Sequence, residues 1–66
     1  MDYAGIRQRL VDARVKKSQT EVAKDLGISV SSLSMYESCV RIPRDEVKEQ
    51  LAKYYGVTVG FLFFGE

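Results

Sequence analysis

The sequence predicts an all-α domain of five short helices. Apolar residues recur at spacings of three and four along the chain, and no stretch sustains the alternation typical of a β-strand. Gly27, Pro43, Gly56 and Gly65 divide the sequence into segments of helical length. A chain of 66 residues can bury one small core but not two, so we expect residues 1–66 to form a single domain.

The first helix is expected to run from Tyr3 to Val15. Its apolar stripe consists of Tyr3, Ile6, Leu10 and Ala13, and the arginines of this segment lie outside the stripe. Neither glycine nor proline follows Val15 closely, so the end of this helix is poorly marked in the sequence.

The second and third helices are separated by a very short connection. Ser18 and Glu21 form a capping box, in which the Ser18 hydroxyl accepts from the Glu21 amide and the Glu21 carboxylate accepts from the Ser18 amide. Gly27 supplies the left-handed conformation that ends the second helix, and Ser29 caps the third helix, which runs to Ser38. The residues expected to face inward are Val22, Ala23, Leu26, Leu33 and Tyr36.

A loop over residues 39–43 precedes the fourth helix. This helix is expected to begin at Arg44 and to end at Gly56, after which Thr58 caps a last short helix. The apolar stripe of the fourth helix consists of Val47, Leu51, Tyr54 and Tyr55.

The fifth helix is apolar on nearly all sides. The face expected to pack on the core carries Val59, Leu62 and Phe63, whereas Phe61 and Phe64 lie outside it. A short terminal helix cannot bury two faces within a small domain. We therefore expect Phe61 and Phe64 to form the interface of a homodimer.

The composition excludes several functional classes. With no His and a single Cys, the chain has neither an internal disulfide nor the residues for a zinc site or a cysteine–histidine nucleophile. The longest apolar run, residues 61–64, is far shorter than the roughly 20 residues that span a bilayer, and the N-terminus does not resemble a signal peptide. We expect a cytoplasmic protein that is not an enzyme, with no cofactor, metal, membrane contact or small-molecule effector.

Two helices joined by a turn of three or four residues containing Gly form a helix-turn-helix connection. Here the connection lies in S-Q-T-E-V-A-K-D-L-G-I-S at residues 18–29 and V-S-S-L-S-M-Y-E at residues 30–37. R-I-P follows at residues 41–43, and L-A-K-Y-Y-G-V-T-V-G-F-L lies at residues 51–62. With these motifs, residues 18–65 resemble the Cro and phage-repressor type of helix-turn-helix transcription regulators, which occur in phages and mobile elements.

The resemblance implies a lambda-repressor-like domain that binds a palindromic operator in double-stranded DNA as a dimer and represses transcription. The third helix would enter the major groove, with Val30, Ser31, Ser34 and Met35 facing the bases. Gln19 matches a residue that contacts phosphate and supports the third helix. The other side chains expected to contact phosphates are Lys17, Ser18, Lys24, Ser29, Ser38, Arg41 and Arg44.

The third helix departs from the family pattern because residues 30–38 contain no Arg, Lys, Gln or Asn. The strong bidentate pairings with guanine or adenine are therefore absent, leaving serine hydroxyls and the contacts of Val30 or Met35 with thymine methyl groups. We hypothesise that specificity depends on half-site spacing and duplex shape.

Two further departures concern single residues. Cys39 stands where the family usually has Gly, and a side chain in a left-handed conformation costs roughly 1 kcal/mol, so a different turn is expected here. Cys39 is expected to be a partly buried small hydrophobe, with a reactive or engineered thiol as the alternative. The helix-one Arg that pairs with a Glu at the position of Glu37 does not align, so either Arg14 or Arg9 substitutes for it.

An alternative function of a different class is an antitoxin-like or adaptor module that uses the same fold to bind a protein through Phe61 and Phe64. The charge distribution favours DNA binding. Residues 1–44 carry eight positive and five negative side chains, whereas residues 45–66 carry two positive and four negative ones. The basic part holds the proposed DNA-binding unit, and the acidic part holds the proposed dimer contact.

Overall fold

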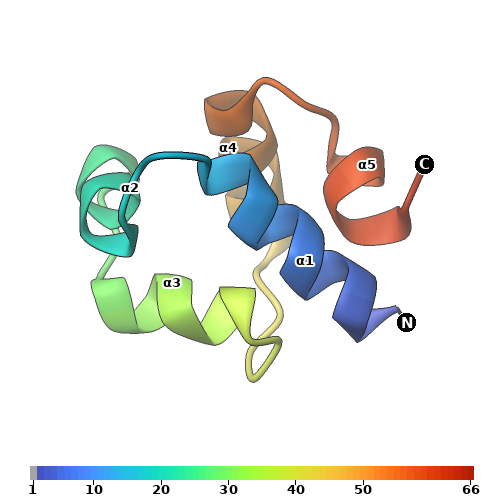
Figure 1. Ribbon diagram of the computed structural model, residues 1–66, viewed down its shortest axis with the longest axis horizontal. Coiled ribbons are helices and arrows are strands. Elements are labelled where there is room, and N and C mark those ends of the chain that lie inside the picture. The colour runs from blue at the N-terminus through green and yellow to red at the C-terminus, as the bar shows by residue number, and fades with distance from the viewer. Residues whose placement is uncertain (1) are drawn as a thin grey trace.

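The computed structural model describes residues 2–66, which form five α-helices and no strand (Figure 1). The helices are α1 (Tyr3–Arg14), α2 (Gln19–Leu26), α3 (Val30–Glu37), α4 (Asp45–Tyr55) and α5 (Val59–Phe64). In Figure 1, α2 and α3 lie together on the left, α1 crosses the centre and α5 lies on the right, near both termini. The prediction of an all-α domain of five helices is confirmed. No helix within residues 2–66 is long and apolar enough to cross a membrane.

All five helices contribute to one hydrophobic core. The buried apolar residues are Ile6, Leu10, Val22, Ala23, Leu33, Leu51, Ala52, Leu62 and Phe63. The helical spacing anticipated most of these positions, but Tyr3 is 51% exposed because it stands in the first turn of α1, ahead of the packed residue Ile6. Leu26, Tyr54 and Tyr55 pack against the core and remain partly buried.

Hydroxyl caps start three of the helices, as the sequence predicts. Ser18 Oγ accepts from the Glu21 amide at 3.1 Å, Ser29 Oγ from the Ser32 amide at 3.0 Å, and Thr58 Oγ1 from the Phe61 amide at 2.9 Å. The reciprocal half of the capping box, from the Ser18 amide to the Glu21 carboxylate, does not form among residues 2–66, so that part of the prediction is wrong.

The helix ends fall into two groups. Gly27, Gly56 and Gly65 close α2, α4 and α5 with φ between 69° and 72°. Val15 closes α1 with φ 53° and ψ −109°, and Cys39 follows α3 with φ 59°. The expectation of a different turn at Cys39 is therefore wrong, because the residue adopts the left-handed conformation in spite of its side chain.

Candidate nucleic-acid interface

The exposed face of α3 is uncharged. Val30 is 41% exposed, Ser31 and Ser34 are also exposed, and Met35 is partly buried. The Ser29 hydroxyl is engaged as the cap of α3 and donates to Ser32 Oγ at 2.9 Å. The face therefore offers two free serine hydroxyls and a few apolar side chains to a ligand, as the composition of the helix predicts.

A buried ion pair fixes the end of α3. The Glu37 side chain is 4% exposed, and its Oε2 lies 2.6 Å from Nε of Arg14, the last residue of α1. Of the two arginines considered from the sequence, Arg14 forms this pair, whereas Arg9 donates to the Leu62 carbonyl at 3.1 Å at the end of α5. Removing one partner of a buried pair typically costs about 3–5 kcal/mol, so this contact has a large role in placing α3.

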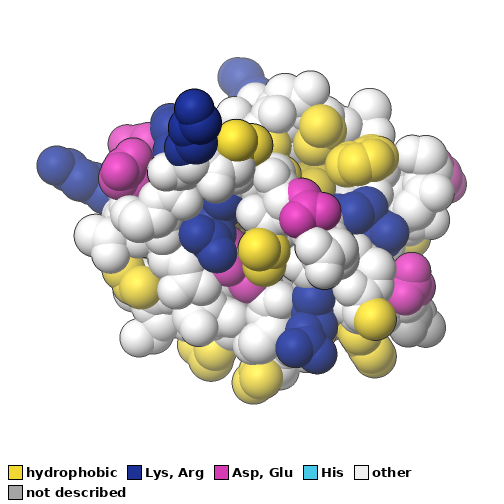
Figure 2. All heavy atoms as spheres, in the orientation of Figure 1, with side chains coloured by type: hydrophobic (Ala, Val, Ile, Leu, Met, Phe, Trp, Pro, Cys, Tyr) yellow, Lys and Arg dark blue, Asp and Glu magenta, His cyan; other side chains and the backbone are white. Residues whose placement is uncertain are grey.

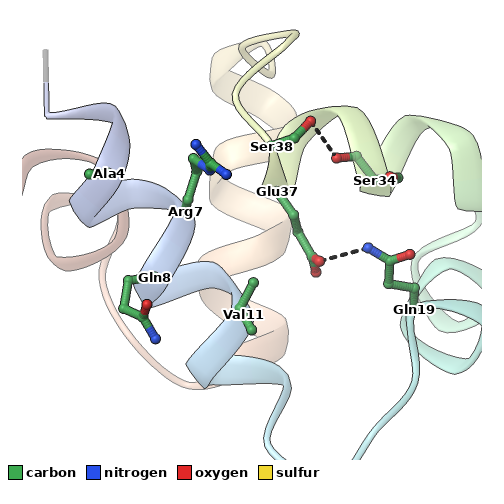
Figure 3. A pocket seen from close by; sticks show the side chains of 8 residues that line it. All are labelled: Ala4, Arg7, Gln8, Val11, Gln19, Ser34, Glu37 and Ser38. Carbon is green, nitrogen blue, oxygen red and sulfur yellow. Dashed lines mark hydrogen bonds between the residues drawn. The ribbon is translucent and has the colours of Figure 1, made fainter.

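Gln19 joins the same cluster from the start of α2. Its Nε2 donates to Glu37 Oε1 at 2.8 Å, as Figure 3 shows. Arg14 also donates through Nη1 to the Lys17 carbonyl at 3.2 Å, which ties the connection between α1 and α2 to the cluster. The N-terminus of α2 and the C-terminus of α3 are thus held in one arrangement, which is the supporting role expected of Gln19.

Lys17 is engaged with α4. Its Nζ donates to the Tyr54 hydroxyl at 2.8 Å and lies 3.6 Å from Asp25 Oδ2. The hydrogen bond with Tyr54 raises the pKa of Lys17, and the Tyr54 hydroxyl, donating to Asp25, lowers the pKa of that carboxyl. Lys17 is therefore engaged with side chains of both α2 and α4.

Arg41 and Arg44 lie together on one flank of α3. Both are exposed, and they line a hollow of about 500 Å³ that also contains Ser32 and Tyr36 of α3. Ser38 lies on a different side of α3, and its hydroxyl donates to the Ser34 carbonyl at 2.9 Å. The sequence predicts that both arginines lie at the proposed interface. In the structure both line the same hollow.

One basic residue beside α3 was missed in the sequence. Arg7 of α1 is exposed and lines a groove of about 450 Å³ with Gln19, Ser34 and Ser38 (Figure 3). The sequence placed Arg7 outside the apolar stripe of α1 but gave no signal of which neighbouring helix it faces, because that depends on how α1 crosses α3.

On the face of the molecule drawn in Figure 2, the basic side chains do not gather in a single patch. Lys and Arg are distributed across this face, with acidic side chains between them. This distribution agrees with the formal net charge of +1 and indicates that individual cations, rather than a general positive surface, would position a polyanion.

The fifth helix presents apolar side chains to solvent. Phe61 and Phe64 are 41% and 58% exposed, as expected from the sequence. Lys48 Nζ lies 5.6 Å from the centre of the Phe64 ring, and a hollow of about 180 Å³ between α4 and α5 opens beside that ring.

Cys39 is half-buried beside the start of α1. Its Sγ lies 3.6 Å from the Tyr3 carbonyl, and burial raises the pKa of the thiol. The expectation of a partly buried thiol is confirmed, and a raised pKa does not favour a reactive thiolate.

Comparisons with known proteins agree with this architecture. The sequence profile of the helix-turn-helix family matches residues 6–62. The cryptic phage CTXphi transcriptional repressor RstR of Vibrio cholerae is 36% identical over 56 residues, a match that covers 82% of this chain and 50% of that protein. The chain thus spans about half the length of this relative, and no solved structure matches the chain significantly. The chain belongs to the helix-turn-helix family, among the regulators of the Cro and phage-repressor type.

Proposed function

We propose that the chain is a sequence-specific DNA-binding regulator that acts as a dimer and represses transcription. In this proposal α3 enters the major groove of a palindromic operator, and the base-facing residues are Val30, Ser31, Ser34 and Met35. Ser18 and Gln19 at the start of α2 contact the phosphate backbone, as do Arg41 and Arg44.

The observation that carries this proposal is the way α3 is held. Arg14, Gln19 and the buried Glu37 form a cluster that joins the N-terminus of α2 to the C-terminus of α3, while the outer face of α3 stays exposed. A face of hydroxyl and methyl groups can approach base edges, whereas arginines beside it fix position on the backbone. The named activity of the relative, transcriptional repression, supports the same conclusion.

Selection from a random pool of duplexes tests the proposal directly. We expect enrichment of a symmetric site whose half-sites lie about one helical turn apart, or a multiple of that distance. Binding should weaken steeply between low and physiological salt, because each neutralised phosphate releases counterions. A pool that shows no enrichment, together with no binding to any duplex at low salt, would overturn the proposal.

The base contacts proposed for α3 can be tested at one position. We expect Val30→Ala to relax the preference for thymine at one position of each half-site, because the side chain then loses its contact with the C5-methyl group. Unchanged preference at every thymine of the operator would remove Val30 from the proposed contacts.

We propose that the dimer forms through α5. Phe61 and Phe64 expose apolar surface on the acidic part of the chain. The helix that carries them, α5, lies apart from α3 in Figure 1. Replacement of both residues by Ser should yield a monomer in sedimentation experiments at tens of micromolar protein and should weaken operator binding. A wild-type chain that sediments as a monomer both with and without the operator would contradict a dimer.

A second candidate is an antitoxin-like or adaptor module, which the exposed Phe61 and Phe64 favour independently. In that case the two phenylalanines bind a different protein, and DNA contact is secondary. Absence of duplex binding at low salt would favour this candidate over the regulator, since the two differ in their need for phosphate contacts.

A further inference from the structure

We propose that the groove between α1 and α3 binds a phosphodiester of duplex DNA through Arg7. In this arrangement Arg7 contacts the DNA strand opposite to the one contacted by Arg41 and Arg44. The inference rests on the proposed function and adds a second backbone contact that flanks α3.

The groove has the size and lining for a phosphate. Its volume is about 450 Å³, and its walls come from α1, the start of α2 and the second half of α3. Figure 3 shows the guanidinium of Arg7 extending from α1 toward α3, near Ser38. Gln8, Gln19, Ser34 and Ser38 border the same space and also carry groups able to donate a hydrogen bond.

Arg7 is the uncompensated charge in this groove. It makes no hydrogen bond or ion pair with any residue in the described range 2–66, and it is exposed. The one carboxylate in the lining belongs to Glu37, which is already paired with Arg14 and bonded to Gln19. The carboxyl end of α3 adds a small negative contribution, but the guanidinium remains free to form two parallel bonds to phosphate oxygens.

The two basic flanks of α3 lie on opposite sides of its base-facing surface. Successive residues of an α-helix are rotated by about 100°, so Ser32 and Tyr36 project toward one flank. Ser38 projects toward the other flank, as does Ser34 at the edge of the base-facing set. The outward residues Ser31 and Met35 fall between these flanks. The first flank faces the hollow of Arg41 and Arg44, and the second faces the groove of Arg7.

A helix in the major groove has one phosphate backbone on each side. The groove is about 12 Å wide and admits one helix, so cations on both flanks of that helix reach both strands. An exposed pair of opposite charges contributes little in water, so a single arginine is too weak to retain a free phosphate ion. The same arginine contributes measurably when it is one of several contacts along a duplex. The geometry therefore points to the DNA backbone as the occupant.

The first test compares the salt dependence of operator binding for the wild-type chain and three variants. We expect Arg7→Ala to reduce the slope of log K against log salt by about 1.8, because the dimer loses one phosphate contact in each half-site and each contact contributes about 0.9. Arg7→Lys should keep the wild-type slope because it retains the charge. Lys53→Ala removes an exposed cation from α4 and should also keep the wild-type slope. Unfolding curves should coincide for all four proteins, since Arg7 and Lys53 are exposed.

The second test locates the phosphate. Operators carrying one neutral methylphosphonate at a time are measured against the wild-type chain, Arg7→Ala and Arg41→Ala. In each half-site we expect one phosphate whose neutralisation weakens operator binding by the wild-type chain and by Arg41→Ala but does not weaken binding by Arg7→Ala any further. Phosphates that lose their effect in Arg41→Ala should lie on the other strand of the same half-site.

The outcomes separate this inference from the proposed function. Wild-type binding with an unchanged slope in Arg7→Ala would overturn the groove contact and leave the regulator in place. The two-strand arrangement would be overturned if the phosphate that loses its effect in Arg7→Ala lies on the same strand as the phosphate that loses its effect in Arg41→Ala. A wild-type chain that binds no duplex would overturn both the proposed function and this inference.

Discussion

The helix ends of this small domain differ in the residue that closes them. Glycine closes α2, α4 and α5, where φ lies between 69° and 72°. After α1 and α3, Val15 and Cys39 adopt φ of 53° and 59° although both carry a side chain. Glycine tolerates a left-handed backbone, whereas the side chains of valine and cysteine make this conformation unfavourable. Among residues 2–66, the non-glycine residues with a left-handed backbone therefore lie in the two connections that follow α1 and α3.

The two strained connections share one feature that the glycine-closed ends lack. Arg14 directly precedes Val15, Glu37 lies two residues before Cys39, and the Arg14–Glu37 pair joins these two helix ends. Strained backbone persists where the surrounding structure fixes it more strongly than the strain opposes it. We infer that the buried cluster holds both connections in place.

The largest effect is expected from breaking this cluster. Arg14→Leu leaves the Glu37 carboxylate buried with Gln19 as its remaining partner, and it should lower the free energy of unfolding by about 3–5 kcal/mol. Urea denaturation followed by circular dichroism measures the change. The double variant Arg14→Leu/Glu37→Leu is the control, because replacing both charges by apolar groups should recover most of the loss. A single variant within about 1 kcal/mol of wild type would contradict a structural role for the pair.

The next effect tests the strain at Val15. With φ 53°, ψ −109° and a hydrogen bond from the Lys17 amide to the Arg14 carbonyl at 2.9 Å, Val15 occupies the first central position of a type II′ turn. This position favours Gly, so Val15→Gly should raise the free energy of unfolding by about 1–3 kcal/mol.

Val40 offers a matched control for this substitution. It is 76% exposed, close to the 79% of Val15, but it does not have a positive φ. Val40→Gly should leave stability unchanged or lower it, because glycine increases the conformational entropy of the unfolded chain. Equal changes in the melting temperature of the two variants would show that Val15 is not strained.

A smaller effect is expected at the glycine-closed ends. An added Cβ at Gly27 or Gly56 would meet no atom within 4 Å, so Ala at either position is opposed only by the backbone conformation. Gly27→Ala should lower the free energy of unfolding by about 1 kcal/mol, and Gly56→Ala should do the same because its φ is also 72°. A marked difference between these two variants would point to a contact beyond the backbone at one of the two ends.

The same comparison explains how much could be predicted from the sequence. Glycine after an apolar stripe and a hydroxyl before one are local signals, and they located the ends of α2, α4 and α5 and three of the caps. Local signals could not show that Val15 closes α1 in a strained turn. They could not choose between Arg9 and Arg14 or place Arg7 opposite α3, because these contacts depend on how α1 packs across the domain. The caps and helix ends were therefore predicted better than the contacts that α1 makes with the rest of the domain.

The smallest net effect is expected at Cys39, where two terms oppose each other. Glycine would relieve a left-handed strain of roughly 1 kcal/mol but would remove a thiol that is partly buried near the Tyr3 carbonyl. Cys39→Ala separates the terms, because it removes the thiol and keeps the strain. Cys39→Gly should be more stable than Cys39→Ala by about 1 kcal/mol and more stable than wild type by roughly half of that. If Cys39→Gly unfolded at a lower temperature than Cys39→Ala, the φ of 59° at Cys39 would be no source of strain. Val15 would then be the one strained residue in the contrast with the glycine-closed helix ends.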